Sequence, residues 1–178
     1  MRDLDTVVRL VRDTEPHGLI AVDGWDGSGK STLASALAQA VSCEYVEVDK
    51  FLERNQGGYL DRIRYPELGA RLGELTELVV VEGVCLREVL ARLGHAPAMS
   101  IYVKVLSSVG TWHPGRWCEF ESAGEAIANH RQTLSLFARA TAQPQPIDGL
   151  EEELIEYHFK WRPHEVSQLI LERVESDA

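Results

Sequence analysis

Apolar residues along this chain follow two patterns, one typical of buried strands and one typical of amphipathic helices. Short, almost wholly apolar runs predict strands that are covered on both faces, and they fall at residues 19–22, 45–48, 78–81, 100–105 and 168–174. Apolar residues at helical spacing predict helices around them, at residues 4–11, 30–41, 66–75, 86–93, 124–140 and 150–157. Strands that alternate with helices favour an α/β fold with a doubly wound parallel sheet of about five strands.

The stretches outside this alternation are the least informative. Residues 52–66 are polar and irregular, residues 144–146 form a proline-bounded loop, and residues 106–125 show no clear period. A chain of 178 residues that is 44% hydrophobic is sufficient for one core of ordinary size. We therefore expect a single domain over residues 1–178, with residues 106–125 as a candidate lid.

Composition and charge narrow the classes of partner. The chain has 28 acidic and 18 basic residues, a net charge of −10, which would repel a nucleic-acid backbone. Cys43, Cys85 and Cys118 are far apart and form no C-x-x-C pair, so we expect reduced thiols. Since no run approaches the roughly 18 apolar residues of a membrane span, we expect a cytoplasmic protein without a membrane partner. The oligomeric state stays open, with a homodimer as one alternative.

The segment from Gly24 to Ser31 carries the clearest chemical signal. It reads Gly-Trp-Asp-Gly-Ser-Gly-Lys-Ser, which matches G-x-x-x-x-G-K-[ST], and it stands between a predicted strand and a predicted helix. Glycines let successive N–H groups point at one phosphate, and the helix N-terminus adds positive potential. A chance match has odds of roughly one in a hundred. The predicted nucleotide-binding residues are Gly24, Trp25, Asp26, Gly27, Ser28, Gly29, Lys30, Ser31 and Thr32.

These residue types indicate an ATP site with Mg²⁺ in a three-layer P-loop NTPase fold. The Lys30 ammonium suits the β- and γ-phosphates, and the Ser31 hydroxyl suits magnesium. Ligands collect at the carboxyl ends of the strands in an open parallel sheet. Asp49 and Glu82 follow the second and third predicted strands, so the fold could bring both carboxylates near the phosphate loop. The alternative for each is a capping or solvated strand-end carboxylate.

Three segments together resemble the uridine kinase and phosphoribulokinase group of P-loop small-molecule kinases. They are the phosphate loop, Val48-Asp-Lys-Phe51 and Val80-Val-Glu-Gly-Val84. The resemblance implies that Asp49 is the general base for the substrate hydroxyl, acting with Lys30 in catalysis. It also implies that Glu82 and Ser31 hold magnesium. The acceptor pocket would include Arg62, Arg64 and Tyr65, although a solvated charged loop is the alternative for these three residues.

The candidate lid departs from the pattern of that group, which usually has an arginine-rich lid. Arg116 is the only Lys or Arg between residues 107 and 118. It is a candidate nucleotide-binding residue. The alternative, which we favour, is an aromatic cluster in which Trp112 and Trp117 pack and Arg116 stacks over a ring.

The function favoured by these features is transfer of the γ-phosphate of ATP to a hydroxyl of a small metabolite, a nucleoside or similar compound. A nucleoside monophosphate kinase is the first alternative, because the phosphate loop also looks like that of thymidylate kinase. That family, however, has an Asp-Arg pair where this chain has Glu82-Gly83. The second alternative is a non-catalytic ATP-binding regulatory module. Neither Asn55 nor Asn129 begins an N-K-x-D segment, which argues against a GTPase.

Overall fold

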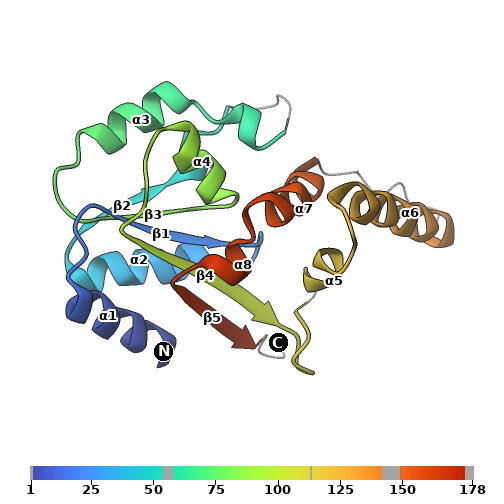
Figure 1. Cartoon of the computed structure of the whole chain (residues 1–178), viewed down its shortest axis with the longest axis horizontal. Helices are drawn as coiled ribbons and strands as arrows, with labels where there is room; N and C mark the ends of the chain where they lie inside the picture. The colour runs from blue at the N-terminus through green and yellow to red at the C-terminus, as the bar shows by residue number, and fades with distance from the viewer. Residues whose placement is uncertain (1, 54–57, 113, 142–148, 175–178) are drawn as a thin grey trace.

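The computed structural model describes residues 2–53, 58–112, 114–141 and 149–174, so the predicted loop at 144–146 lies outside the described residues (Figure 1). The five strands are β1 (Leu19–Gly24), β2 (Glu44–Glu47), β3 (Val79–Gly83), β4 (Met99–Leu106) and β5 (Leu169–Val174). The helices are α1 (Arg2–Thr14), α2 (Lys30–Val41), α3 (Tyr65–Gly73), α4 (Leu86–Arg92), α5 (Gly115–Cys118), α6 (Ala123–Thr141), α7 (Gly149–Trp161) and α8 (Pro163–Val166). Two 3₁₀ turns, η1 (Val48–Phe51) and η2 (Leu60–Arg62), follow β2.

All five strands pair in parallel, in the order β2-β3-β1-β4-β5. The central strand β1 pairs with both β3 and β4, so Val22 stands beside Glu82 on one side and Ile101 on the other. The predicted doubly wound α/β fold is confirmed. The predicted strands and longer helices are all present, with ends that differ by a few residues.

Side chains alternate across the sheet and produce two cores. Ile20 and Val22 of β1 pack with the apolar sides of α1 and α2. Leu19 and Ala21 face the opposite side, in a core that includes residues of α3, α4 and α7. Successive side chains of a strand point to opposite faces of the sheet. The face on which a residue at the end of a strand lies therefore follows from its spacing to the buried residues before it.

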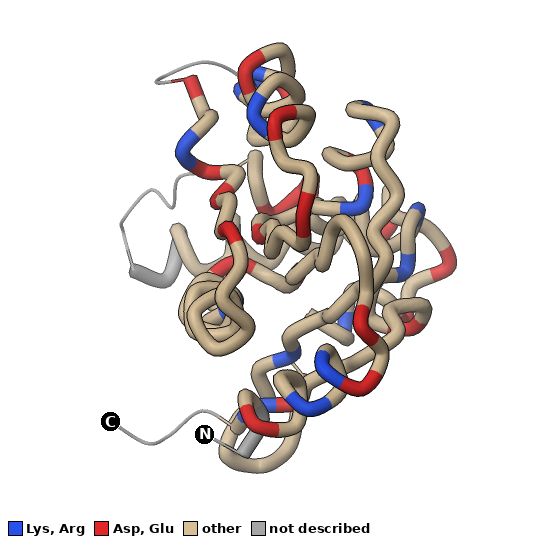
Figure 2. Tube along the Cα trace, turned by 90° about the vertical axis from the view of Figure 1, so that its left-hand side faces the viewer, with Lys and Arg blue, Asp and Glu red and all other residues tan. Residues whose placement is uncertain are grey.

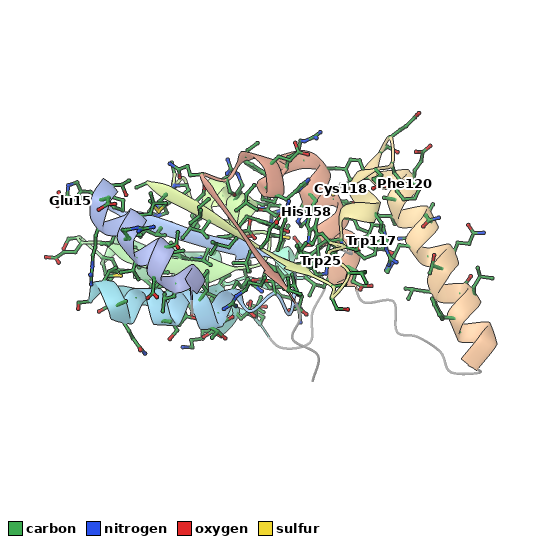
Figure 3. All side chains as sticks on the ribbon, turned by 90° about the horizontal axis from the view of Figure 1, so that it is seen from below. Glu15, Trp25, Trp117, Cys118, Phe120 and His158 are labelled. Carbon is green, nitrogen blue, oxygen red and sulfur yellow. The ribbon has the colours of Figure 1, made fainter. Side chains whose placement is uncertain are left out.

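The short helix α5 and the long helix α6 form a separate unit with α7. Trp117, Ala126 and Ile155, one from each of these helices, are buried against one another. From this contact α6 extends away from the sheet (Figures 1 and 3). The sequence predicts neither α5 nor α8, each of which is four residues long.

Charged positions of both signs are mixed along the helices, as Figure 2 shows for one side of the molecule. Among the helices that the structure describes, none is both long enough and apolar enough to cross a bilayer.

Candidate active site at the carboxyl end of the sheet

The phosphate loop lies between β1 and α2, as predicted. Gly27 and Gly29 have φ values of 70° and 77°, in the left-handed region that glycine adopts without strain. At Gly24 an added Cβ would lie 2.6 Å from Ser28 Oγ and 2.9 Å from the Val103 carbonyl oxygen, so only glycine fits. The buried Lys30 ammonium donates to the Trp25 carbonyl oxygen across the loop, at 3.4 Å.

Glu82 lies on the face of β3 that is covered by α2. Val80 packs under α2, and Glu82, two residues later, reaches the first turn of the same helix. Its side chain is only 1% exposed, so Glu82 is not a solvated strand end. Burial raises the pKa of this carboxyl group, while the Lys30 charge and a hydrogen bond from the Ser31 hydroxyl lower the pKa.

The surroundings of Glu82 fit a magnesium ion. Tyr45 donates its hydroxyl hydrogen to Glu82 Oε1 at 3.3 Å. In the described part of the chain, no donor meets the distance and angle of a hydrogen bond to the buried Oε2. A carboxylate oxygen with an open coordination direction beside the Ser31 hydroxyl is the kind of oxygen pair that Mg²⁺ takes from a protein.

Asp49 lies in the turn η1 and not at the end of β2, which ends two residues earlier, at Glu47. Its side chain is exposed, and its Oδ1 accepts a hydrogen bond of 2.8 Å from the buried hydroxyl of Tyr59. The Asp49 charge is close enough to raise the pKa of Glu82. The structure therefore places both predicted carboxylates at the same edge of the sheet, with Lys30 close to Glu82.

Arg64 holds the turn that carries Asp49. Its guanidinium donates to the backbone carbonyl oxygens of Lys50, at 2.9 Å, and Phe51, at 3.3 Å. It also pairs with Glu67 at 2.6 Å. These contacts give Arg64 a structural role next to Asp49, and its predicted contact with substrate stays a prediction.

Arg62 and Tyr65 each have a buried polar atom. Among the described residues, no acceptor lies within hydrogen-bond geometry of Arg62 Nε–H. Burial raises the pKa of Tyr65, against the smaller, lowering effect of Arg92, which interacts with the Tyr65 hydroxyl. The Tyr65 ring lies beneath the guanidinium of Arg92, 5.7 Å from ring centroid to Cζ. Like Arg64, both residues remain predicted members of the acceptor pocket.

The predicted stacking of Arg116 over a tryptophan ring is present in the candidate lid. The Arg116 guanidinium lies over the ring of Trp117 at 4.5 Å. Trp117 in turn stacks on Trp25 of the phosphate loop, with ring centroids 5.0 Å apart (Figure 3). A cavity of about 270 Å³ opens between the loop and Trp112, and Arg116 is not among its lining residues. A direct contact between Arg116 and nucleotide stays a prediction.

Arg173 is a cation of the site that the sequence analysis did not identify. It lies on β5, on the same face as the buried Leu171, and so points toward the start of α2. Its Nη1 donates to the Gly29 carbonyl oxygen at 3.3 Å. The guanidinium is thus packed against the phosphate loop from the side opposite to Glu82, since β3 and β5 flank the pair formed by β1 and β4.

On the opposite face of β1, Asp23 contacts α7. Its Oδ1 accepts a hydrogen bond from the Gly24 N–H at 2.7 Å, and Oδ2 accepts a hydrogen bond from the Tyr157 hydroxyl. The Arg87 N–H donates to the same hydroxyl at 3.2 Å. Burial raises the pKa of Asp23 to about 6, against the opposing effect of these hydrogen bonds from Tyr157 and Gly24. The next residue of α7, His158, lies 2.6 Å from the Tyr102 hydroxyl.

Asp23→Asn should change how stability depends on pH. Between pH 3.8 and about 6 the folded protein holds a proton on Asp23 that the unfolded chain has lost. Asp23 therefore stabilises the folded state at the low end of this window, and its contribution is lost as pH rises through it, by about 3 kcal/mol. In urea titrations, the free energy of unfolding of wild type, minus that of Asp23→Asn, should fall by about 2 kcal/mol between pH 3.8 and 6, with the remainder lost outside these limits.

The difference in unfolding free energy between wild type and Asp23→Asn isolates the contribution of the Asp23 carboxyl group. Burial lowers the pKa of His158 to about 4, which makes stability fall as pH decreases from 6.5. That effect is common to both proteins and cancels in the difference. Asp13→Asn removes an exposed carboxylate and gives the reference curve. A difference between wild type and Asp23→Asn that stays constant with pH would contradict the assignment.

Comparison with known proteins finds a family match on the segment that holds most of the phosphate loop and Asp49. A family model for shikimate kinase matches residues 26–64. A shikimate kinase from Chlorobium phaeovibrioides is 30% identical over 101 residues, which cover 53% of this chain and 49% of the relative. One from Chlorobium luteolum is 39% identical over 62 residues, or 35% of this chain and 31% of the relative. The matches span about half or less of the length of these relatives.

Similarity in structure extends along the whole chain. The solved structure of a possible uridine kinase from Bacillus stearothermophilus superposes with a TM-score of 0.55 at 12% identity. The superposition covers 96% of this chain and 98% of that one. At this level of identity the likeness concerns the fold. Together with the all-parallel sheet and the phosphate loop before α2, it shows that the chain has the three-layer fold of P-loop NTPases.

Proposed function

We propose that this chain is an ATP-dependent kinase that phosphorylates a hydroxyl group of a small molecule. The observation that carries the proposal is the convergence of the phosphate loop, Glu82 and Asp49 at one edge of the sheet. The match of residues 26–64 to the shikimate kinase model supports it, because this segment includes most of the phosphate loop as well as Asp49.

The described residues supply the parts that phosphoryl transfer requires. The loop amides and Lys30 bind the triphosphate, and Asp49 accepts the proton of the attacking hydroxyl. Ser31 and Glu82 would hold Mg²⁺, which neutralises charge on the phosphates when it is bound. Lys30 and Glu82 are buried next to each other, whereas the Asp49 carboxylate is exposed, where an acceptor hydroxyl could reach it.

For the acceptor, we propose a hydroxylated ring that carries an anionic group, as in the substrate from which shikimate kinase takes its name. The family match ends at residue 64 and so includes Arg62 and Arg64. Arg62 Nε–H is buried, and no hydrogen-bond acceptor lies within reach of it among the described residues. A carboxylate of the substrate would accept this hydrogen bond. The nucleoside acceptor implied by the uridine kinase resemblance is the second candidate.

A turnover assay tests the proposal directly. The protein is incubated with ATP and Mg²⁺ and a panel that contains shikimate, other hydroxy acids, uridine, cytidine and sugar acids. We expect ADP release that depends on one class of acceptor and stops when EDTA is added. Binding of ATP without acceptor-dependent ADP release would favour a non-catalytic nucleotide-binding module, and phosphorylation of a nucleoside monophosphate would favour the thymidylate kinase alternative.

Arg173→Ala should weaken nucleotide binding. The guanidinium lies against Gly29 at the start of α2, where it adds positive potential to that of the loop amides. We expect the Kd for ATP with Mg²⁺ to rise about tenfold, as for the loss of one partly buried charge contact. Arg173→Lys should recover part of the affinity. Isothermal titration measures both, and equal affinities of wild type and Arg173→Ala would remove Arg173 from the nucleotide site.

A further inference from the structure

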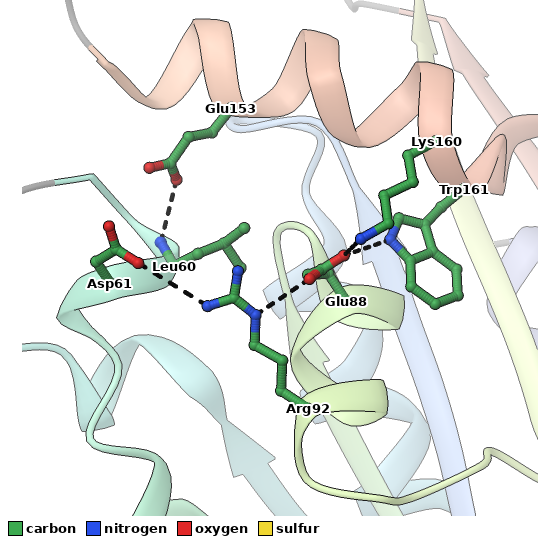
Figure 4. A network of polar contacts seen from close by, with 7 residues as sticks. All are labelled: Leu60, Asp61, Glu88, Arg92, Glu153, Lys160 and Trp161. Atoms are coloured by element: carbon green, nitrogen blue, oxygen red, sulfur yellow. Dashed lines mark hydrogen bonds and ion pairs between the residues drawn. The ribbon is translucent and has the colours of Figure 1, made fainter.

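The helix α7 contacts the segment that carries the candidate acceptor residues. Glu153, in the first half of α7, accepts a hydrogen bond of 3.1 Å from the Leu60 N–H through Oε2 (Figure 4). The other carboxylate oxygen lies directly over Gly58, where an added Cβ would come within 1.6 Å of it. Only glycine at position 58 allows the carboxylate to approach the backbone this closely.

The Glu153 carboxylate therefore caps the turn η2. Burial raises its pKa, and hydrogen bonds from the backbone N–H groups of Leu60 and Tyr59 lower the pKa. A carboxylate at the start of a helical turn satisfies N–H groups that have no partner within the turn. Glu153 thus holds the backbone of Tyr59 through these hydrogen bonds.

Tyr59 connects this cap to Asp49. Its side chain is 3% exposed and packs in the same core as Leu154 and Tyr157 of α7. Its hydroxyl donates to Asp49 Oδ1 at 2.8 Å. A continuous chain of contacts therefore runs from Glu153 through the backbone and ring of Tyr59 to the carboxylate of Asp49.

The position of α7 is itself fixed at its other end. Lys160 Nζ and Trp161 Nε1 each donate to Glu88 Oε2 of α4 at 2.6 Å. Arg92 of α4 joins Glu88, at 3.1 Å, to Asp61 of η2, at 3.9 Å. Figure 4 shows α7, α4 and η2 linked in this way, so Glu153 extends from a firmly held helix.

We propose that Glu153 and Tyr59 are positioning residues for Asp49, a role that rests on the proposed kinase function. Asp49 is exposed and belongs to a short turn, and Tyr59 is the side chain whose hydrogen bond sets the direction of its carboxylate. A general base acts only when it lies within hydrogen-bond reach of the acceptor hydroxyl, and small displacements are costly. The α7 carboxylate thus acts on catalysis without touching either substrate.

Two single variants and their combination test the positioning contacts from Glu153 through Tyr59 to Asp49. Glu153→Ala and Tyr59→Phe should each lower kcat about tenfold, while KM for ATP stays within about twofold of wild type. The double variant should be little slower than the slower single variant, because both changes interrupt one chain of contacts. Glu153→Gln keeps an oxygen acceptor for the Leu60 N–H and should recover most of the activity. Glu156→Ala, an exposed change on the same helix, is the matched control.

A readout independent of turnover accompanies the kinetics. Amide hydrogen exchange at Tyr59 and Leu60 should become faster in Glu153→Ala and remain at the wild-type rate in Glu156→Ala. Additive losses in the double variant, unchanged exchange, or a kcat for Glu153→Ala near that of wild type would each overturn the positioning role. If wild type itself phosphorylates no acceptor, the proposed function fails instead. Tyr59→Phe and Glu153→Gln keep the test decisive should Glu153→Ala fold poorly.

Discussion

Asp49→Asn should lower kcat by about 10²–10⁴-fold, the range expected for loss of a general base. An asparagine amide has nearly the shape of the carboxylate but cannot take the proton of the acceptor hydroxyl. The Tyr59 hydroxyl can still donate to the amide oxygen, so the turn η1 should keep its geometry. KM for ATP should stay near the wild-type value, because Asp49 does not belong to the phosphate loop. Steady-state ADP release with the best acceptor of the panel measures both constants.

Glu53→Gln provides the matched control for Asp49→Asn. Glu53 is an exposed carboxylate a few residues further along the chain, and its backbone N–H, which the substitution leaves intact, donates to the Arg62 carbonyl oxygen. We expect Glu53→Gln to retain wild-type kcat. Equal turnover by wild type and Asp49→Asn would remove Asp49 from the reaction and leave the acceptor hydroxyl to lose its proton by another route.

Lys30→Ala should weaken binding of ATP with Mg²⁺ by about 10²–10³-fold, since truncation of one member of a buried charge pair costs about 2–5 kcal/mol. The ammonium is 6% exposed, and Trp25 and Glu82 hold it at the loop by a hydrogen bond and by charge attraction. Turnover should fall further than affinity, because the lysine also stabilises the charge on the transferring phosphoryl group. Isothermal titration and initial rates measure the two effects.

Lys50→Ala controls for a general loss of positive charge. Lys50 is exposed, and its ammonium pairs with Glu47 at the surface. Its removal should leave the Kd for ATP near that of wild type. Should Lys30→Ala bind ATP as tightly as Lys50→Ala does, the phosphate loop would not be the nucleotide site and the proposed function would lose its basis.

The sheet and its long helices could be predicted from sequence because each has a strong local signal. The strand β3 reads Val-Val-Val before Glu82, and α2 follows a glycine-rich loop with apolar residues on one face. The order of the five strands follows from topology rules for parallel sheets only in outline. The four-residue helices α5 and α8 could not be predicted, since a helix of one turn has no period to detect.

The phosphate loop, Asp49 and Glu82 could be located from sequence because each lies at the end of a strand or within two residues after it. Tyr59, Glu153 and Arg173 could not, since each acquires its contact only through the tertiary structure. The hydrogen bond between Glu153 and Leu60 joins residues 93 positions apart, and that between Arg173 and Gly29 joins residues 144 apart. The face of Arg173 could have been inferred from its spacing to Leu171, once β5 was known to border the site.

The predicted role of Arg116 shows how one residue type supports two readings. A single arginine among tryptophans suits both phosphate neutralisation and stacking, and its ring contact with Trp117 is present in the structure. Trp112 and Trp117, one on either side of Arg116 in the sequence, favour the second interpretation.

The placement of α7 bears on how this protein could change its substrate in evolution. The helix contacts Asp23 beside the nucleotide loop, Glu88 on α4 and Leu60 in the acceptor segment. A replacement on its inward side would disturb donor and acceptor recognition at once, so new acceptor preferences would arise more readily by changes elsewhere. The far end of α6, where Leu136 and Phe137 are more than half exposed, makes none of these three contacts.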